Sequence, residues 1–125
     1  MTLLFMFFLH IVDDFYLQPG MLSKLKCIDF WEENAPDKLY RYDFVAALII
    51  HSFSWSFMIM LPIFFNEGFM ISSQLIGLLV GNLGIHLMVD NAKANFKNIN
   101  LCVDQSIHVI QIVSTFLFWR YVYCG

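Results

Sequence analysis

Hydrophobic residues gather in four long stretches of the chain, which short polar segments separate. The stretches cover residues 2–17, 43–65, 72–92 and 101–123. A helix rises about 1.5 Å per residue and the hydrocarbon core of a bilayer is about 30 Å thick, so about 20 apolar residues span it. The first stretch is a little short, and the other three are long enough. The pattern predicts an all-α polytopic membrane bundle of four helices, with residues 1–125 as a single integral membrane domain.

The segment between the first two stretches has a different pattern. A Gln-Pro-Gly sequence at 18–20 ends the first stretch. In 21–42, charged residues alternate with apolar ones that recur at helical spacing, namely Met21, Leu25, Ile28 and Trp31. This is typical of an amphipathic helix in the membrane interface. A partly ordered loop fits the same residues equally well.

Composition supports a membrane protein. The chain is 59% hydrophobic and 14% charged, whereas soluble domains are roughly half apolar and about a quarter charged. The net charge of −3 and the lack of a basic patch exclude nucleic acid as a partner and leave the lipid bilayer. The three cysteines, Cys27, Cys102 and Cys124, lack metal-type spacing and are predicted to be free thiols. The first stretch lacks a basic start and a small-residue cleavage site, so we expect a retained helix rather than a signal peptide.

Lysine and arginine positions predict the orientation in the membrane. The connection 18–42 carries four of them, and the connection between the last two stretches carries Lys93 and Lys97, while Asn66–Met70 has none. Basic loops lie on the cytoplasmic side of bacterial membranes. With four crossings, both basic connections are predicted to be cytoplasmic and both termini outside.

Three of the four histidines have an aspartate one helical turn away. The pairs are His10 with Asp14, His86 with Asp90, and Asp104 with His108. Residues four apart share one face of a helix, so each pair presents an imidazole beside a carboxylate. The fourth histidine, His51, lies about two turns inside the second stretch. All seven residues are predicted at the same depth, in the cytoplasmic half of the bilayer.

These side chains predict a buried metal centre. An unpaired aspartate in a membrane helix costs roughly 2.5–3.5 kcal/mol, and a shared divalent cation would offset that cost. Imidazole and carboxylate suit zinc, which we favour, and also manganese or iron. The predicted ligands are His10, Asp14, His51, His86, Asp90, Asp104 and His108, with Asp14, Asp90 and Asp104 as catalytic groups. Seven exceed the four ligands of a tetrahedral site, so either two ions bind, or one ion binds and the surplus residues transfer protons.

Further residues lie beside this cluster. Gln18, Lys93 and Gln105 are predicted to bind substrate, although Lys93 could instead extend toward the interface. On the opposite face of 72–92, three small residues favour close helix contact. These residues, Gly77, Gly81 and Gly84, predict either another span or a second protomer, as in a homodimer, as the neighbour.

The ordered motifs resemble a family of small bacterial and phage membrane proteins known as a domain of unknown function. Its pattern reads H-x-x-x-D-F-x-L-Q (residues 10–18), a central histidine (His51), H-x-x-x-D-x-x-K (86–93) and D-Q-x-x-H (104–108). The match covers nearly the whole chain. Family members often carry a second histidine near the central one, whereas this chain has Trp55 four residues after His51.

The family is in turn similar to predicted membrane-bound metal-dependent hydrolases, which implies hydrolysis in the bacterial inner membrane. We therefore expect a membrane-embedded hydrolase with its site near the cytoplasmic face, acting on a lipid or a lipid-linked phosphate or amide. The alternatives are a metal-ion or proton transporter, and a non-enzymatic phage or bacterial protein that interacts with the membrane.

Overall fold

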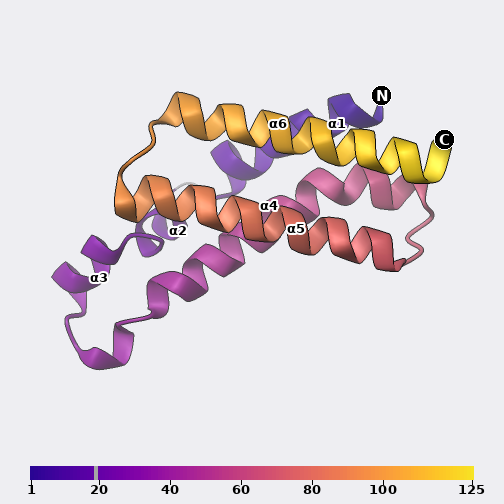
Figure 1. Cartoon of the computed structure of the whole chain (residues 1–125). Coiled ribbons are helices and arrows are strands. Elements are labelled where there is room, and N and C mark those ends of the chain that lie inside the picture. Colours follow the sequence, from indigo (N-terminus) through magenta and orange to yellow (C-terminus); the bar gives the residue numbers. More distant parts are fainter. Residues whose placement is uncertain (19) are drawn as a thin grey trace.

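The computed structural model describes residues 1–18 and 20–125, and all regular structure in these residues is helical (Figure 1). The longer helices are α1 (Thr2–Val12), α4 (Asp43–Asn66), α5 (Ser73–Asn91) and α6 (Leu101–Trp119). Two short helices, α2 (Met21–Leu25) and α3 (Ile28–Asn34), and a 3₁₀ turn, η2 (Lys38–Tyr40), lie between α1 and α4. π-helical turns extend three of the helices, namely η1 (Asp13–Leu17), η3 (Ala92–Phe96) and η4 (Arg120–Cys124). The all-α prediction is confirmed for the described residues.

Three segments are long and apolar enough to cross a membrane: Lys38–Asn66, Ser73–Phe96 and Leu101–Cys124. They match the last three hydrophobic stretches of the sequence. The first stretch, α1 with η1, runs only from Thr2 to Leu17, which at 1.5 Å per residue is roughly 24 Å of helix. Three of the four expected spans are therefore confirmed in length and composition.

The four longer helices pack in a ring. α1 contacts α4 and α6, and α5 contacts the same two helices. Both termini lie at one end, with the connection from α4 to α5, while α2, α3 and the connection from α5 to α6 lie at the other (Figure 1). The two basic connections of the sequence thus share one end of the molecule.

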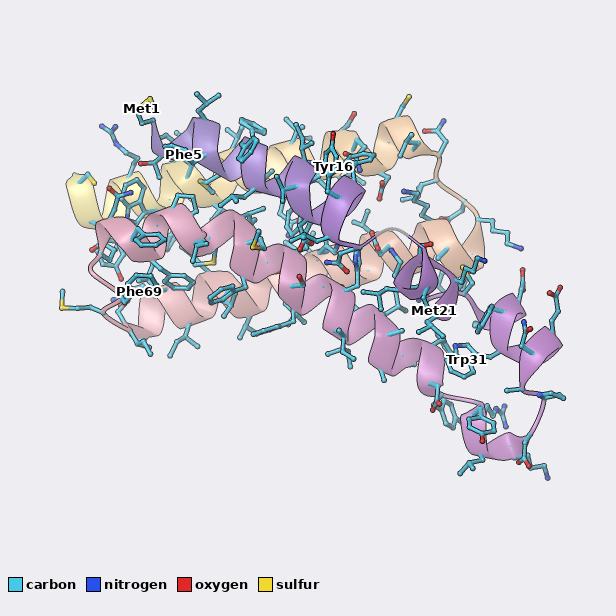
Figure 2. All side chains as sticks on the ribbon, turned by 180° about the vertical axis from the view of Figure 1, so that it is seen from behind. Met1, Phe5, Tyr16, Met21, Trp31 and Phe69 are labelled. Carbon is cyan, nitrogen blue, oxygen red and sulfur yellow. The ribbon has the colours of Figure 1, made fainter. Side chains whose placement is uncertain are left out.

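The segment between α1 and α4 forms two short helices rather than one amphipathic helix. Neither α2 nor α3 has a fully buried residue, and both contact α4. The indole Nε1 of Trp31 donates a hydrogen bond to the Leu25 carbonyl, at 2.9 Å, which closes the turn between them. Met21 and Trp31 mark this part in Figure 2.

The distribution of polar and apolar side chains is the reverse of that in a soluble protein. His86, Asp104 and His108 are at most 1% exposed, while Phe8 is 59% and Ile110 64% exposed. Phe5 and Tyr16 likewise project outward from the first helix (Figure 2). Exposed apolar side chains around an interior that is partly polar are typical of a surface that faces lipid.

The interior has two layers. Near the termini lies an apolar cluster of Met6, Trp55, Ile59, Met60, Ile63, Leu75, Ile112 and Trp119. Toward the other end the buried residues are mostly histidine, aspartate and their partners. The polar layer therefore lies toward the end that carries α2 and η3.

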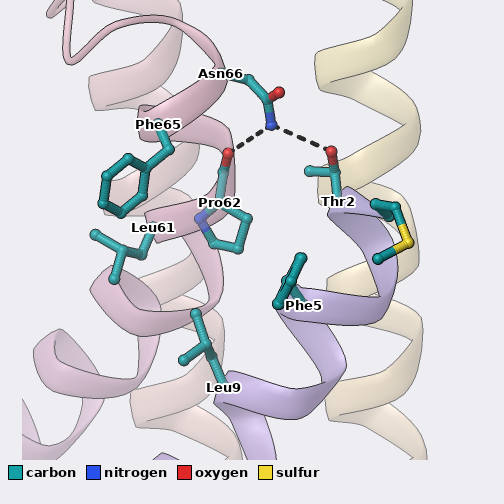
Figure 3. Close-up of a pocket in the computed structure, with 8 residues that line it drawn as sticks. Thr2, Phe5, Leu9, Leu61, Pro62, Phe65 and Asn66 are labelled. Atoms are coloured by element: carbon teal, nitrogen blue, oxygen red, sulfur yellow. Dashed lines mark hydrogen bonds between the residues drawn. The ribbon is translucent and has the colours of Figure 1, made fainter.

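A polar contact ties the start of α1 to the end of α4. Asn66 Nδ2 donates to the carbonyl of Pro62, at 2.6 Å, and to Thr2 Oγ1, at 3.1 Å (Figure 3). These residues border an apolar hollow of about 460 Å³ between the two helices. Because the contact holds α1 against α4 at the termini, it sets the height at which His10 enters the polar layer.

Nothing packs closely on the glycine face of α5 among the described residues. A Cβ placed at Gly77, Gly81 or Gly84 would meet nothing within 4 Å. Gly77 and Gly81 instead border a groove whose other side is α6, lined there by Ile107, Ile110 and Ser114. A second protomer stays a prediction.

Substitution of Gly81 by alanine tests that prediction. In an isolated protomer the change should raise the free energy of unfolding by about 0.5–1 kcal/mol, because alanine is the better helix former and no contact is lost. Thermal unfolding in detergent micelles, followed by circular dichroism, measures it. A decrease in stability would instead indicate that another protomer packs closely on this face.

Candidate metal centre

Four helices bring the predicted residues together in the polar layer. His10 and Asp14 come from α1 and η1, and His51 comes from α4. The other four come from the facing ends of α5 and α6: His86, Asp90, Asp104 and His108. All are buried except Asp14, which is partly exposed. The prediction that these side chains converge is confirmed.

His86, Asp90 and His108 form one group that could hold a metal ion. One ligand atom from each lies within 4.8 Å of the others. Asp90 Oδ1 is 3.6 Å from His86 Nε2 and 3.8 Å from His108 Nε2. In a tetrahedral zinc site with bonds of about 2.0–2.1 Å, ligand atoms are about 3.4 Å apart. A small contraction would bring this group to that geometry.

Several polar atoms in this group and in the adjacent Asp104 are buried without a hydrogen-bond partner among the described residues. They are both ring nitrogens of His108, Nδ1 of His86 and Oδ1 of Asp104. The nearest approach is 3.2 Å, between His108 Nε2 and Asp104 Oδ1. Buried unpaired groups cost about 1–3 kcal/mol each, and native interiors contain few of them. An ion held there would give His108 Nε2 a partner and would lie close to Asp104 Oδ1, whereas the two Nδ1 atoms point away from it. Imidazole and carboxylate are ligands that zinc binds, so the residues fit a metal.

A second group shares one member with the first. Asp14, His51 and His86 also offer ligand atoms within 4.8 Å of one another. His51 Nε2 is 3.1 Å from His86 Nε2 and 3.9 Å from Asp14 Oδ1. A neutral imidazole nitrogen has one lone pair and binds one ion. The shared histidine therefore favours one ion over two, with the surplus groups free for proton transfer.

The hydrogen bonds of His51 direct its other nitrogen at the cluster. Gln18 Nε2 donates to Asp13 Oδ2, at 2.5 Å, so Gln18 Oε1 is left to accept from His51 Nδ1, also at 2.5 Å. The Nε2 of a neutral His51 then carries a lone pair, 2.8 Å from Asp90 Oδ2. Two acceptors this close require a proton or a metal ion between them.

His10 lies in the cluster but in neither metal-binding group. The indole Nε1 of Trp55 donates to His10 Nδ1, at 2.8 Å, and His10 Nε2 lies 3.1 Å from Gln105 Oε1. Both ring nitrogens are thus engaged by protein groups, with Nε2 as the donor. Asp104 also lies outside both groups, and its Oδ2 accepts from Lys93 Nζ at 2.7 Å.

The three residues predicted to bind substrate occupy different positions. Gln18 is buried and its amide is used by Asp13 and His51, so its geometry suits orientation of His51. Gln105 links His10, Asp14 and Asp104 through hydrogen bonds of 3.1–3.4 Å. Only Lys93 combines a charged group with substantial exposure, 39% of its side chain.

Sequence reasoning missed the roles of Lys26 and Trp55. Lys26 Nζ lies 2.6 Å from Asp90 Oδ2, although the two residues are 64 positions apart and no sequence pattern links them. Trp55 is fully buried and stacks on His86, with ring centroids 4.2 Å apart. Its spacing of four from His51 did place it on the same helix face, and that signal could have found it.

A polar cavity of about 160 Å³ connects the cluster to the surface. Its lining consists of Asp14, Phe15, Gln18, Ser23, Lys26, His51, Asp90, Lys93, Leu101, Asp104 and Gln105. The residues come from α2, η3 and the facing ends of the longer helices, so the cavity opens at the end opposite the termini.

Comparisons with protein-family models, with curated proteins and with solved structures find no match to this chain. The function is therefore inferred from the site itself.

Trp55→Phe tests the position of His10. The change removes the indole N–H but keeps an aromatic ring, so His10 Nδ1 should be left buried and unpaired. We expect a loss of about 1–3 kcal/mol in the free energy of unfolding, measured in detergent micelles.

Trp119→Phe is the matched control, because Trp119 Nε1 donates to Glu67 Oε1, at 2.8 Å, near the other end. Glu67 is partly exposed and can regain a partner from solvent. Equal losses in the two variants would contradict a specific role for the Trp55–His10 contact.

Proposed function

We propose that the protein is a membrane-embedded metal-dependent hydrolase with one divalent ion, zinc by preference, bound by His86, Asp90 and His108. The observation that carries this proposal is the spacing of those three ligand atoms beside buried imidazole and carboxylate atoms that have no partner. Open access from one end supports catalysis over a purely structural ion, because substrate and water need a path to the site.

A divalent ion held there would polarise the oxygen of the bond to be cleaved and make water more acidic. Asp14 and His51 line the cavity and are groups that can accept a proton. Gln105 approaches Asp14 Oδ2 at 3.4 Å, and Gln18 holds His51. The chain thus offers a proton acceptor on the side of the cavity that faces the ligand set.

We further propose that α1 with η1 is the fourth crossing of a bacterial inner membrane, with both termini outside and the cavity near the cytoplasmic face. The shared end of the termini and the lysines around the cavity support this topology. The short length of α1 is compatible with local bilayer thinning.

Transport is the less favoured function. A carrier needs a polar path to both faces of the membrane. In the described residues, Gln111, Asn82 and Thr115 form a further polar set on α5 and α6, joined by hydrogen bonds of 2.8–3.1 Å. Beyond them the apolar cluster that includes Ile63 closes the interior.

Metal content of the purified protein tests the proposal. We expect about one zinc or other divalent ion per chain. Asp90→Asn and His86→Gln should each weaken metal affinity at least tenfold, because a carboxamide is a poorer ligand than the carboxylate or imidazole that it replaces. Inductively coupled plasma mass spectrometry of detergent-purified protein gives the stoichiometry. Hydrolysis of membrane lipid extracts by the loaded protein is then the activity test.

Asp29→Asn is the matched control, since Asp29 is exposed and pairs with Lys97 outside the cluster. It should bind metal as the wild type does. Absence of bound metal from wild-type protein after mild purification and zinc supplementation would rule out the proposed function.

The free cysteines allow a test of topology. Cys124, in η4, lies at the end of the molecule where the two termini are found. Cys27, between α2 and α3, and Cys102, at the start of α6, lie at the end where the cavity opens. In spheroplasts, we expect a membrane-impermeant maleimide to modify a variant that keeps only Cys124. A variant that keeps only Cys102 should react with the maleimide only after the membrane has been permeabilised. The opposite labelling pattern would reverse the proposed orientation.

A further inference from the structure

Two lysines reach the cavity from outside the ring of helices. Lys26 follows α2, and its Nζ lies 2.6 Å from Asp90 Oδ2. Lys93 belongs to η3, and its Nζ lies 2.7 Å from Asp104 Oδ2. Both line the cavity of about 160 Å³. Each ammonium group therefore sits between a carboxylate of the cluster and the space that a substrate would enter.

The π-helical turn η3 fixes both lysines. It carries Lys93 directly, and its Asn95 holds the chain on both sides of Cys27. Asn95 Nδ2 donates to the Lys26 carbonyl at 3.0 Å, and Asn95 Oδ1 accepts from the Ile28 amide at 2.7 Å. Asn91 Oδ1 in turn accepts from Asn95 Nδ2 at 2.7 Å. Lys26 is thus held in place by its backbone, although its helix lies outside the ring.

The charge around the cavity favours an anion once the ligand set holds a divalent ion. Three carboxylates and two ammonium groups line it. Alone they leave one negative charge, and a divalent ion changes this to one positive charge. A neutral amide or ester would leave that positive charge unbalanced, whereas lysine is a common ligand of phosphate.

The size of the cavity agrees with a small anionic group. A water molecule takes about 30 Å³ of liquid volume, so the cavity has room for a phosphate group but not for a whole lipid. The rest of the substrate would lie outside it, at the end of the molecule where α2 and α3 are found.

We propose that Lys26 and Lys93 form a phosphate subsite, so that the substrate is a phosphate monoester. This inference rests on the proposed hydrolase. In the reaction the oxygen of water would bond to phosphorus while the bond from phosphorus to the ester oxygen breaks. One proton of the water, accepted by Asp14 or His51, would pass to the departing alcohol, leaving inorganic phosphate. The alcohol is either a lipid or a soluble molecule.

Isothermal titration of zinc-loaded protein in detergent tests the subsite without an activity assay. The probes are inorganic phosphate, dihexanoyl phosphatidic acid as a lipid monoester, and dihexanoyl phosphatidylcholine as a diester control. Wild-type protein should bind one or both of the first two and not the third. Tighter binding of phosphatidic acid than of phosphate would assign the lipid as the source of the anion.

Lys26→Gln and Lys93→Gln should each weaken phosphate binding about ten- to a hundredfold, because each removes one charge-assisted hydrogen bond. Lys97→Gln is the matched control from the same connection, since Lys97 pairs with Asp29 at 2.6 Å and lies outside the cavity. Asn95→Ala keeps both charges and should still weaken binding by releasing Lys26. This variant covers the case in which loss of Lys26 impairs folding.

Metal content, measured separately in each variant, keeps the two proposals apart. Full metal content with no binding of either monoester would overturn the subsite and leave the hydrolase standing. Affinities in Lys26→Gln and Lys93→Gln equal to that in Lys97→Gln would also overturn it. Loss of metal from Lys26→Gln would assign Lys26 to the metal centre and not to substrate.

Discussion

Carboxylates buried among apolar helices are the constraint on which the structure depends. Asp13, Asp90 and Asp104 are at most 5% exposed, and a buried charge without a partner costs several kcal/mol. Each has at least one partner from another element: Ser54 for Asp13, Lys26 and His51 for Asp90, and Lys93 for Asp104. In a lipid surrounding, apolar packing alone gives helices little preference for one another. These polar contacts therefore specify which helices meet and at what height.

Trp55 joins this polar layer to the apolar one. Its ring stacks on His86 and its N–H reaches His10, while the same side chain belongs to the apolar cluster with Met6 and Ile112. An indole suits this boundary because it combines a large apolar body with one donor. A histidine at the same position would add a metal ligand. It would also remove the large apolar ring that separates the His/Asp residues from the apolar cluster near the termini.

The sequence predicted the contacts that form within a single helix. The three pairs at spacing four are close in space, at 3.6 Å for His10–Asp14 and 3.2 Å for Asp104–His108, because one helical turn sets that distance. Contacts between distant segments were not predictable, and Lys26 with Asp90 is the main example. The short length of α1 with η1, by contrast, was already visible in the length of the first hydrophobic stretch. The convergence of four helices was predicted only through the shared depth of their ionisable groups.

The two sides of the cluster differ in how completely their imidazole and carboxylate atoms are paired, although α4 also has two buried hydroxyls, of Ser52 and Ser56, without a partner in the described residues. On α1 and α4, Asp13, Gln18 and His51 form a closed set of hydrogen bonds. On α5 and α6, His86, His108 and Asp104 supply all the imidazole and carboxylate atoms that are buried without a partner in the described chain. A network that served stability alone would be expected to pair both sides equally, since each unpaired atom lowers stability. The asymmetry is what a ligand site requires, with one side held rigid by its own hydrogen bonds and the other left with lone pairs for a cation.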